Sequence, residues 1–71
     1  MKFYELFKVA DLKTRYKIYQ EVEKNEIGLL IDCTGYEVSD KLPFSTLLKE
    51  VVYMTYIKDD KGVALNVLIT K

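Results

Sequence analysis

The sequence predicts one small α+β domain over residues 1–71, with a four-stranded antiparallel sheet and two short helices on one face. Three observations predict this fold. The chain has 71 residues and no linker rich in Pro, Gly or Ser, which favours a single domain. Its apolar residues follow helical spacing and then alternate, and this succession occurs twice. Polar segments of hairpin length divide each alternating part into two strands.

The first half predicts a helix followed by a hairpin. One helical face carries Phe3, Leu6, Phe7 and Ala10. Alternation then begins at residue 14, and the polar residues 23–26 form the predicted turn. The residues predicted to face the core are Tyr16, Ile18 and Val22 on the first strand and Ile27, Leu29, Ile31 and Cys33 on the second. Residues 34–40 are predicted to extend this strand or to cross the surface, with a bend or bulge at Gly35.

The second half repeats the order. Pro43 fits the first turn of a short helix, whose apolar stripe is Phe44, Leu47 and Leu48. The β-branched and aromatic run 51–57 predicts a third strand, residues 58–62 a turn, and residues 63–70 a fourth strand. A single antiparallel sheet would then hide the three phenylalanines beneath the helices. The pattern is compatible with several strand orders.

Charge is balanced in total but not along the chain. Eleven Lys and Arg residues oppose eleven Asp and Glu residues, which removes the long-range attraction that dominates nucleic-acid binding and the strong negative field of a nucleic-acid mimic. Residues 1–20 and 41–71 are mildly basic, whereas residues 21–40 are acidic. The acidic segment is either a solvated hairpin end or a contact patch for a basic partner, formed by Glu21, Glu23 and Glu26.

The composition argues against catalysis. The chain has no histidine, and therefore lacks the usual general base and the commonest metal ligand. Its single cysteine, Cys33, has the parity of a core residue and leaves zinc without a ligand set. The clustered carboxylates fall in predicted turns, where solvation explains them. We therefore expect no enzyme activity, no metal and no cofactor.

Six tyrosines are an excess for a chain of this length. Tyr16 and Tyr56 share the inward parity and are predicted at the edge of the core. Tyr19 and Tyr53 have the opposite parity, which they share with Arg15, Lys17 and Thr55. A sheet face without helices would present them as a solvated surface, as a protein-binding surface, or as a platform for single-stranded nucleic acid, the last being disfavoured by the neutral net charge. A further alternative is a homodimer through an uncapped edge strand, such as the last strand with Leu68 outward.

The order of these elements resembles a known group of proteins. The residues that carry the resemblance are Phe3-Tyr4-Glu5-Leu6-Phe7, Arg15-Tyr16-Lys17-Ile18-Tyr19, Tyr36-Glu37-Val38-Ser39-Asp40 and Leu47-Leu48-Lys49-Glu50-Val51-Val52. They are similar to small proteins encoded by phages and other mobile elements of low-GC Gram-positive bacteria. The resemblance implies a protein that binds and blocks a host protein, such as a CRISPR-type defence effector.

The expected function is therefore that of a protein-interaction module. Its partner would be a host or viral protein, bound through Arg15, Lys17, Tyr19, Tyr53 and Thr55 or through the acidic segment. No apolar run of membrane-spanning length occurs in the sequence. An unpaired cysteine agrees with a reducing compartment, and we expect a cytoplasmic location.

Overall fold

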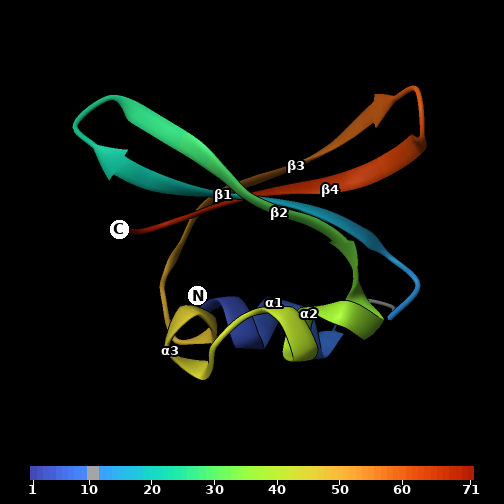
Figure 1. Ribbon diagram of the computed structural model, residues 1–71, viewed down its shortest axis with the longest axis horizontal. Coiled ribbons are helices and arrows are strands. Elements are labelled where there is room, and N and C mark those ends of the chain that lie inside the picture. The colour runs from blue at the N-terminus through green and yellow to red at the C-terminus, as the bar shows by residue number, and fades with distance from the viewer. Residues whose placement is uncertain (10–11) are drawn as a thin grey trace.

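A computed structural model describes residues 1–9 and 12–71 of the chain (Figure 1). Three short helices lie on one face of a four-stranded sheet, which confirms the predicted α+β class and adds one helix. The helices are α1 (Phe3–Val9), α2 (Gly35–Lys41) and α3 (Phe44–Leu47). The strands are β1 (Arg15–Glu23), β2 (Glu26–Thr34), β3 (Val51–Asp59) and β4 (Gly62–Ile69).

The sheet is mixed, so the expectation of a wholly antiparallel sheet is wrong. Its strand order is β2-β1-β4-β3, in which two antiparallel hairpins meet through the parallel pair β1 and β4. Between β2 and β3 the chain passes through α2 and α3 beneath the sheet, from one edge to the other (Figure 1). This crossing places β4 in the centre, next to β1 and in the same direction. The last strand is therefore central, and it is not available as the uncapped edge strand considered for a homodimer.

Both predicted turns are confirmed. Two residues join β1 to β2, and the second, Asn25, has φ 66°. Two residues join β3 to β4, and Gly62 follows with φ 108°. Asparagine and glycine are the residues that adopt positive φ at least cost, which is why these polar segments close hairpins. The two hairpin ends diverge on the side of the sheet away from the helices (Figure 1).

The core lies between the helices and the central strands. Its buried apolar residues are Phe3, Leu6, Tyr16, Ile18, Cys33, Val38, Leu42, Leu65, Val67 and Ile69, with Phe7, Ile31, Leu47 and Val51 packed against it. Apolar burial of this kind is the main stabilising contribution to folding. Ala10, the last residue of the predicted α1 stripe, lies outside the described residues.

Several residues predicted in the core are instead exposed. Tyr56 is 71% exposed and Phe44 is 70% exposed, and Val22 is also exposed. Helix α3 is a single turn, and Leu48 lies beyond it as the C-cap. Thr46 and Leu47 face the core, whereas Phe44 and Leu48 are exposed. The hairpin ends extend away from the helices (Figure 1), and Val22 and Tyr56 belong to the last parts of β1 and β3.

Residues 35–41 form a helix rather than a strand extension or a surface loop. The backbone N–H and the hydroxyl of Thr34 both donate to Glu37 Oε1, at 3.3 and 3.2 Å. The sequence Thr34-Gly35-Tyr36-Glu37 has the Thr-x-x-Glu spacing of a capping box, which was the available signal for this helix start. Gly35 is not a bulge but a close approach: its N–H donates to the carbonyl of Thr14 at 2.9 Å.

Candidate protein-interaction face

The face of the sheet opposite the helices, here called the outer face, carries a row of large side chains across all four strands. The register pairs Leu29 with Tyr19, Tyr19 with Leu68, and Leu68 with Tyr53. Residues paired in register point to the same face, so these four residues form one aromatic row. Leu29 is 54% exposed and Tyr53 is 61% exposed. The parity that placed Tyr19 and Tyr53 on one face is therefore correct.

A β-bulge at Leu30 adds two residues to this face that were predicted to face the core. The register steps from Ile18 opposite Ile31 to Tyr19 opposite Leu29, which leaves Leu30 without an opposite residue. An extra residue reverses the parity of the strand before it. Ile27, opposite Glu21, and Leu29 therefore lie on the outer face, and both are exposed. The only sequence signal was the uninterrupted run Leu29-Leu30-Ile31.

A polar row lies next to the aromatic row. It consists of Asp32, Lys17, Asn66 and Thr55, again one residue from each strand. Thr55, a predicted contact residue, is half-buried here. The outer face is thus divided into an apolar part towards the β1–β2 turn and a polar part towards the β3–β4 turn.

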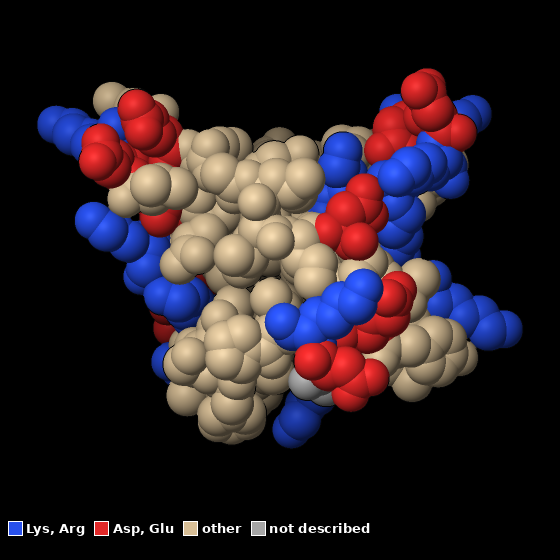
Figure 2. Space-filling model, in the orientation of Figure 1, with Lys and Arg blue, Asp and Glu red and all other residues tan. Residues whose placement is uncertain are grey.

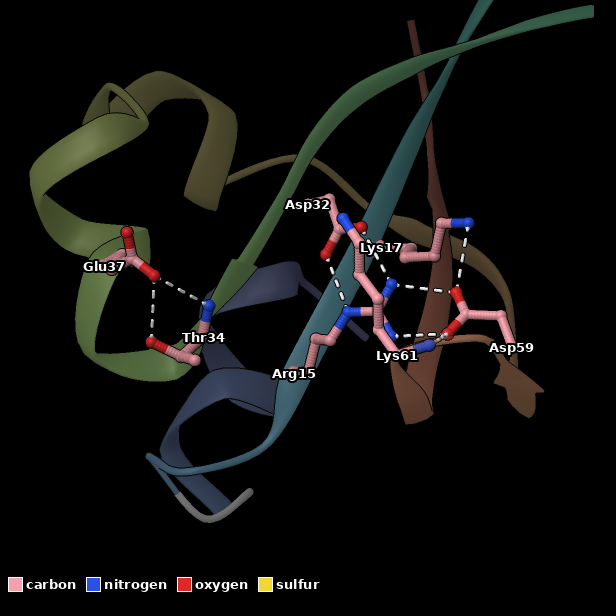
Figure 3. A network of polar contacts seen from close by, with 7 residues as sticks. All are labelled: Arg15, Lys17, Asp32, Thr34, Glu37, Asp59 and Lys61. Carbon is pink, nitrogen blue, oxygen red and sulfur yellow. Dashed lines mark hydrogen bonds and ion pairs between the residues drawn. The ribbon is translucent and has the colours of Figure 1, made fainter.

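Arg15 joins the two hairpins across the polar part (Figure 3). Its Nε–H and Nη2–H donate to the two carboxylate oxygens of Asp32, both at 2.9 Å. Its Nη1–H and Nη2–H donate to the two oxygens of Asp59, both at 2.8 Å. Lys17 Nζ lies 3.7 Å from Asp59 Oδ2, and the backbone N–H of Lys61 donates to Oδ1 of Asp59 at 2.9 Å. Only an arginine fork supports two bidentate carboxylate pairs.

The ion-pair network fixes the charge states of its members. Hydrogen bonds from Arg15 hold the pKa of Asp59 and the pKa of Asp32 below the usual range for aspartate, and the two carboxylates raise the pKa of Arg15. Two cations, Arg15 and Lys17, thus meet two anions. The side chain of Arg15 is only 16% exposed. Neither predicted basic contact residue presents a free positive charge. Arg15 lies 17 residues before Asp32 and 44 residues before Asp59 in the sequence. No local sequence pattern therefore predicted the network.

The acidic segment 21–40 does not form one patch. Asp32 is paired with Arg15, and Glu37 forms an ion pair with Lys41 at 2.8 Å on α2. Glu21, Glu23 and Glu26 remain at the β1–β2 hairpin end, here called the acidic tip, where they form no ion pair with any described residue. Figure 2 shows charged side chains at the two hairpin ends and uncharged surface between them.

Cys33 is buried, and desolvation raises the pKa of its thiol. Within residues 1–9 and 12–71, His, Cys, Asp and Glu side chains form no group of three or more suited to a metal ion. No helix in the same part of the chain has the length and apolar character needed to cross a membrane.

Comparisons with protein-family models, with curated proteins and with solved structures found no match to this chain. Function is therefore inferred from the outer face itself.

Proposed function

We propose that the chain is a protein-interaction module whose outer face binds a partner protein without catalysing a reaction. The observation that carries this proposal is the aromatic row Leu29, Tyr19, Leu68 and Tyr53, which crosses the whole sheet and is open to solvent at both ends. Ile27, opposite Glu21 on the same face, enlarges it and is exposed. A contiguous exposed apolar patch of this kind typically marks an interaction site, and tyrosine is enriched among binding hot spots.

The charges around the row favour a particular chemistry for the partner. The acidic tip borders the row at Glu21 and Ile27, and its three glutamates outnumber the one cation in the turn, Lys24. On the other side, Arg15 and Lys17 are already paired with carboxylates. The complementary surface is therefore apolar and flanked by Lys or Arg side chains. The same paired cations argue against the alternative function, binding of single-stranded nucleic acid, because phosphate contacts need free positive charge.

In the form that the sequence resemblance implies, the partner is a host protein and the chain inhibits it. A CRISPR-type defence effector is one such host protein. Binding through a rigid sheet face would block a surface or an assembly step of the partner.

The binding face is tested with an identified partner and matched variants. A protein captured from a bacterial lysate is purified, and its dissociation constant is measured against the wild-type chain and a Tyr19→Ala, Leu29→Lys double variant. The double variant removes the tyrosine ring and introduces a lysine charge that the partner would bury. It should therefore weaken binding about 100-fold or more. Tyr36→Lys is the control, because Tyr36 is exposed on α2, on the opposite side of the sheet.

Two results would refute the proposed face. One is a double variant that folds, as judged by circular dichroism, and binds the partner as tightly as the wild type. The other is a stronger effect of Tyr36→Lys than of the double variant. Titration of labelled single-stranded DNA at low salt addresses the alternative, and we expect no binding; tight binding that weakens steeply with salt would favour a nucleic-acid function instead.

A further inference from the structure

We propose that β3 is a pairing edge for a second copy of this chain. The two β3 strands would pair antiparallel about a twofold axis through Thr55, so that the two sheets become one continuous sheet. This proposal does not depend on the partner protein discussed above. It rests on the free backbone of β3, on its composition and on the exposure of its side chains.

The edge of β3 is covered at its beginning and free beyond it. The N-terminal residues pair with the segment before β3: the N–H of Phe3 donates to the carbonyl of Lys49 at 2.9 Å, and the N–H of Val51 donates to the carbonyl of Met1 at 2.8 Å. In the described part of the chain, no other segment forms a backbone hydrogen bond with the free side of β3 after Val51. Its remaining outward N–H and C=O groups are a template for another strand.

The composition of β3 does nothing to prevent such pairing. Residues 51–57 contain no charged residue, no proline and no glycine, and they are mostly β-branched or aromatic. Uncharged segments of this type at an exposed edge are the ones that pair with other chains. The opposite edge, β2, carries Glu26 and Asp32, and its bulge at Leu30 interrupts the middle of the strand. Bulges and charges are the usual protection of an edge, so β3 is the edge suited to pairing.

The register follows from two limits on β3. Its pairing with β4 becomes regular at Tyr53, after the irregularity at Val52, and its uncharged run ends at Ile57. The midpoint of residues 53–57 is Thr55. A twofold axis there places Tyr53 opposite Ile57 of the second copy on the outer face, and Met54 opposite Tyr56 on the helix side. Both are pairs of an aromatic with an aliphatic side chain, the kind that stabilises adjacent strands. Each copy would contribute the same contacts, as a twofold interface requires.

The exposure of Tyr56 supports the same arrangement. Tyr56 is paired with the core residue Leu65 and so points to the helix side, but it is 71% exposed. Met54, on the same side of β3, is 42% exposed. Pairing about Thr55 would bring these two side chains from each copy together. The zero net charge of the chain adds no repulsion between copies.

Sedimentation equilibrium of the full chain tests the pairing. The wild type should approach the dimer mass as concentration rises. Thr55→Lys and Thr55→Glu each place like charges opposite one another at the axis and should raise the dimer dissociation constant about tenfold or more. An equimolar mixture of the two variants should regain the dimer, because lysine then faces glutamate. Leu29→Lys, the same change on the outer face of the other edge strand, should leave the dimer intact.

Several outcomes would overturn the proposal. A wild type that remains monomeric at its highest soluble concentration would do so. The proposal would also fail if Leu29→Lys weakened the dimer as much as Thr55→Lys does. It would fail too if the mixture of Thr55→Lys and Thr55→Glu stayed monomeric. If the Thr55 variants do not fold, amide hydrogen exchange of the wild type tests the pairing instead. Amides of residues 53–57 should exchange more slowly at high than at low concentration, and rates independent of concentration would exclude pairing through β3.

Discussion

Gly35→Ala should strongly destabilise the fold, because a side chain at this position meets backbone. Helix α2 begins where the chain passes the segment before β1. A Cβ atom at residue 35 would lie 2.8 Å from the carbonyl oxygen of Leu12 and 2.9 Å from its Cα. Side chains can rotate away from such a contact, but these two atoms belong to the main chain. The start of α2 and the segment around Leu12 would have to separate.

The size of the effect follows from what holds these segments together. Two backbone hydrogen bonds do so, from Gly35 N–H to the carbonyl of Thr14 at 2.9 Å and from Tyr36 N–H to the carbonyl of Leu12 at 3.2 Å. Each contributes about 1 kcal/mol net. Overpacking adds about 1–3 kcal/mol, and the better helix propensity of alanine returns about 1 kcal/mol. We expect a loss of about 2–4 kcal/mol from a total near 4–10 kcal/mol for a chain of this length.

Urea denaturation followed by far-UV circular dichroism measures this loss. Thermal unfolding should show a midpoint lower by about 10–25 °C. Gly28→Ala is the matched control, because its Cβ would lie 3.3 Å from Cγ2 of Val22, an exposed side chain that can move. We expect the control to cost less than about 1 kcal/mol. The close-approach reasoning fails if Gly35→Ala is no less stable than Gly28→Ala.

Three further predictions concern the network and the core. Because Arg15 lowers the pKa of Asp32 and of Asp59 in the folded state, their contribution to stability is complete above the unfolded aspartate pKa of about 3.9 and disappears as the pH falls towards the folded values. Arg15→Met should therefore be less stable than the wild type near neutral pH, and its urea midpoint should fall less than that of the wild type on acidification. Urea midpoints of the two proteins that change in parallel with pH would contradict this. Cys33, buried and with a raised pKa, should react with a thiol reagent only on unfolding, and rapid reaction of the folded protein would show that the thiol is accessible. Ile18→Ala, at a fully buried position, should cost about 2–5 kcal/mol in urea denaturation, and a loss below about 1 kcal/mol would mean that the site is not tightly packed.

The sequence by itself determined the elements that depend on local pattern. Helical spacing located α1, alternation located β1, β2 and β4, and β-branched and aromatic composition located β3. The polar residues 23–26 and 58–62 marked the two turns. The same parity put Cys33 in the core and Tyr19 beside Tyr53 on the outer face. These features follow from backbone geometry over a few residues, which a single segment contains. Helix α2 belongs with them, since its capping box is present in the sequence, although residues 34–40 were predicted to extend the second strand or to cross the surface.

Only the tertiary structure decided which segments meet. The parallel pairing of β1 with β4 depends on a chain crossing beneath the sheet, and the Arg15 network depends on that pairing. The bulge at Leu30 moved Ile27 and Leu29 from the predicted core to the outer face. Tyr56 has inward parity but is exposed. Parity indicates the side of a sheet to which a residue points; it does not indicate whether another layer covers that side, because cover depends on how far distant segments extend across it.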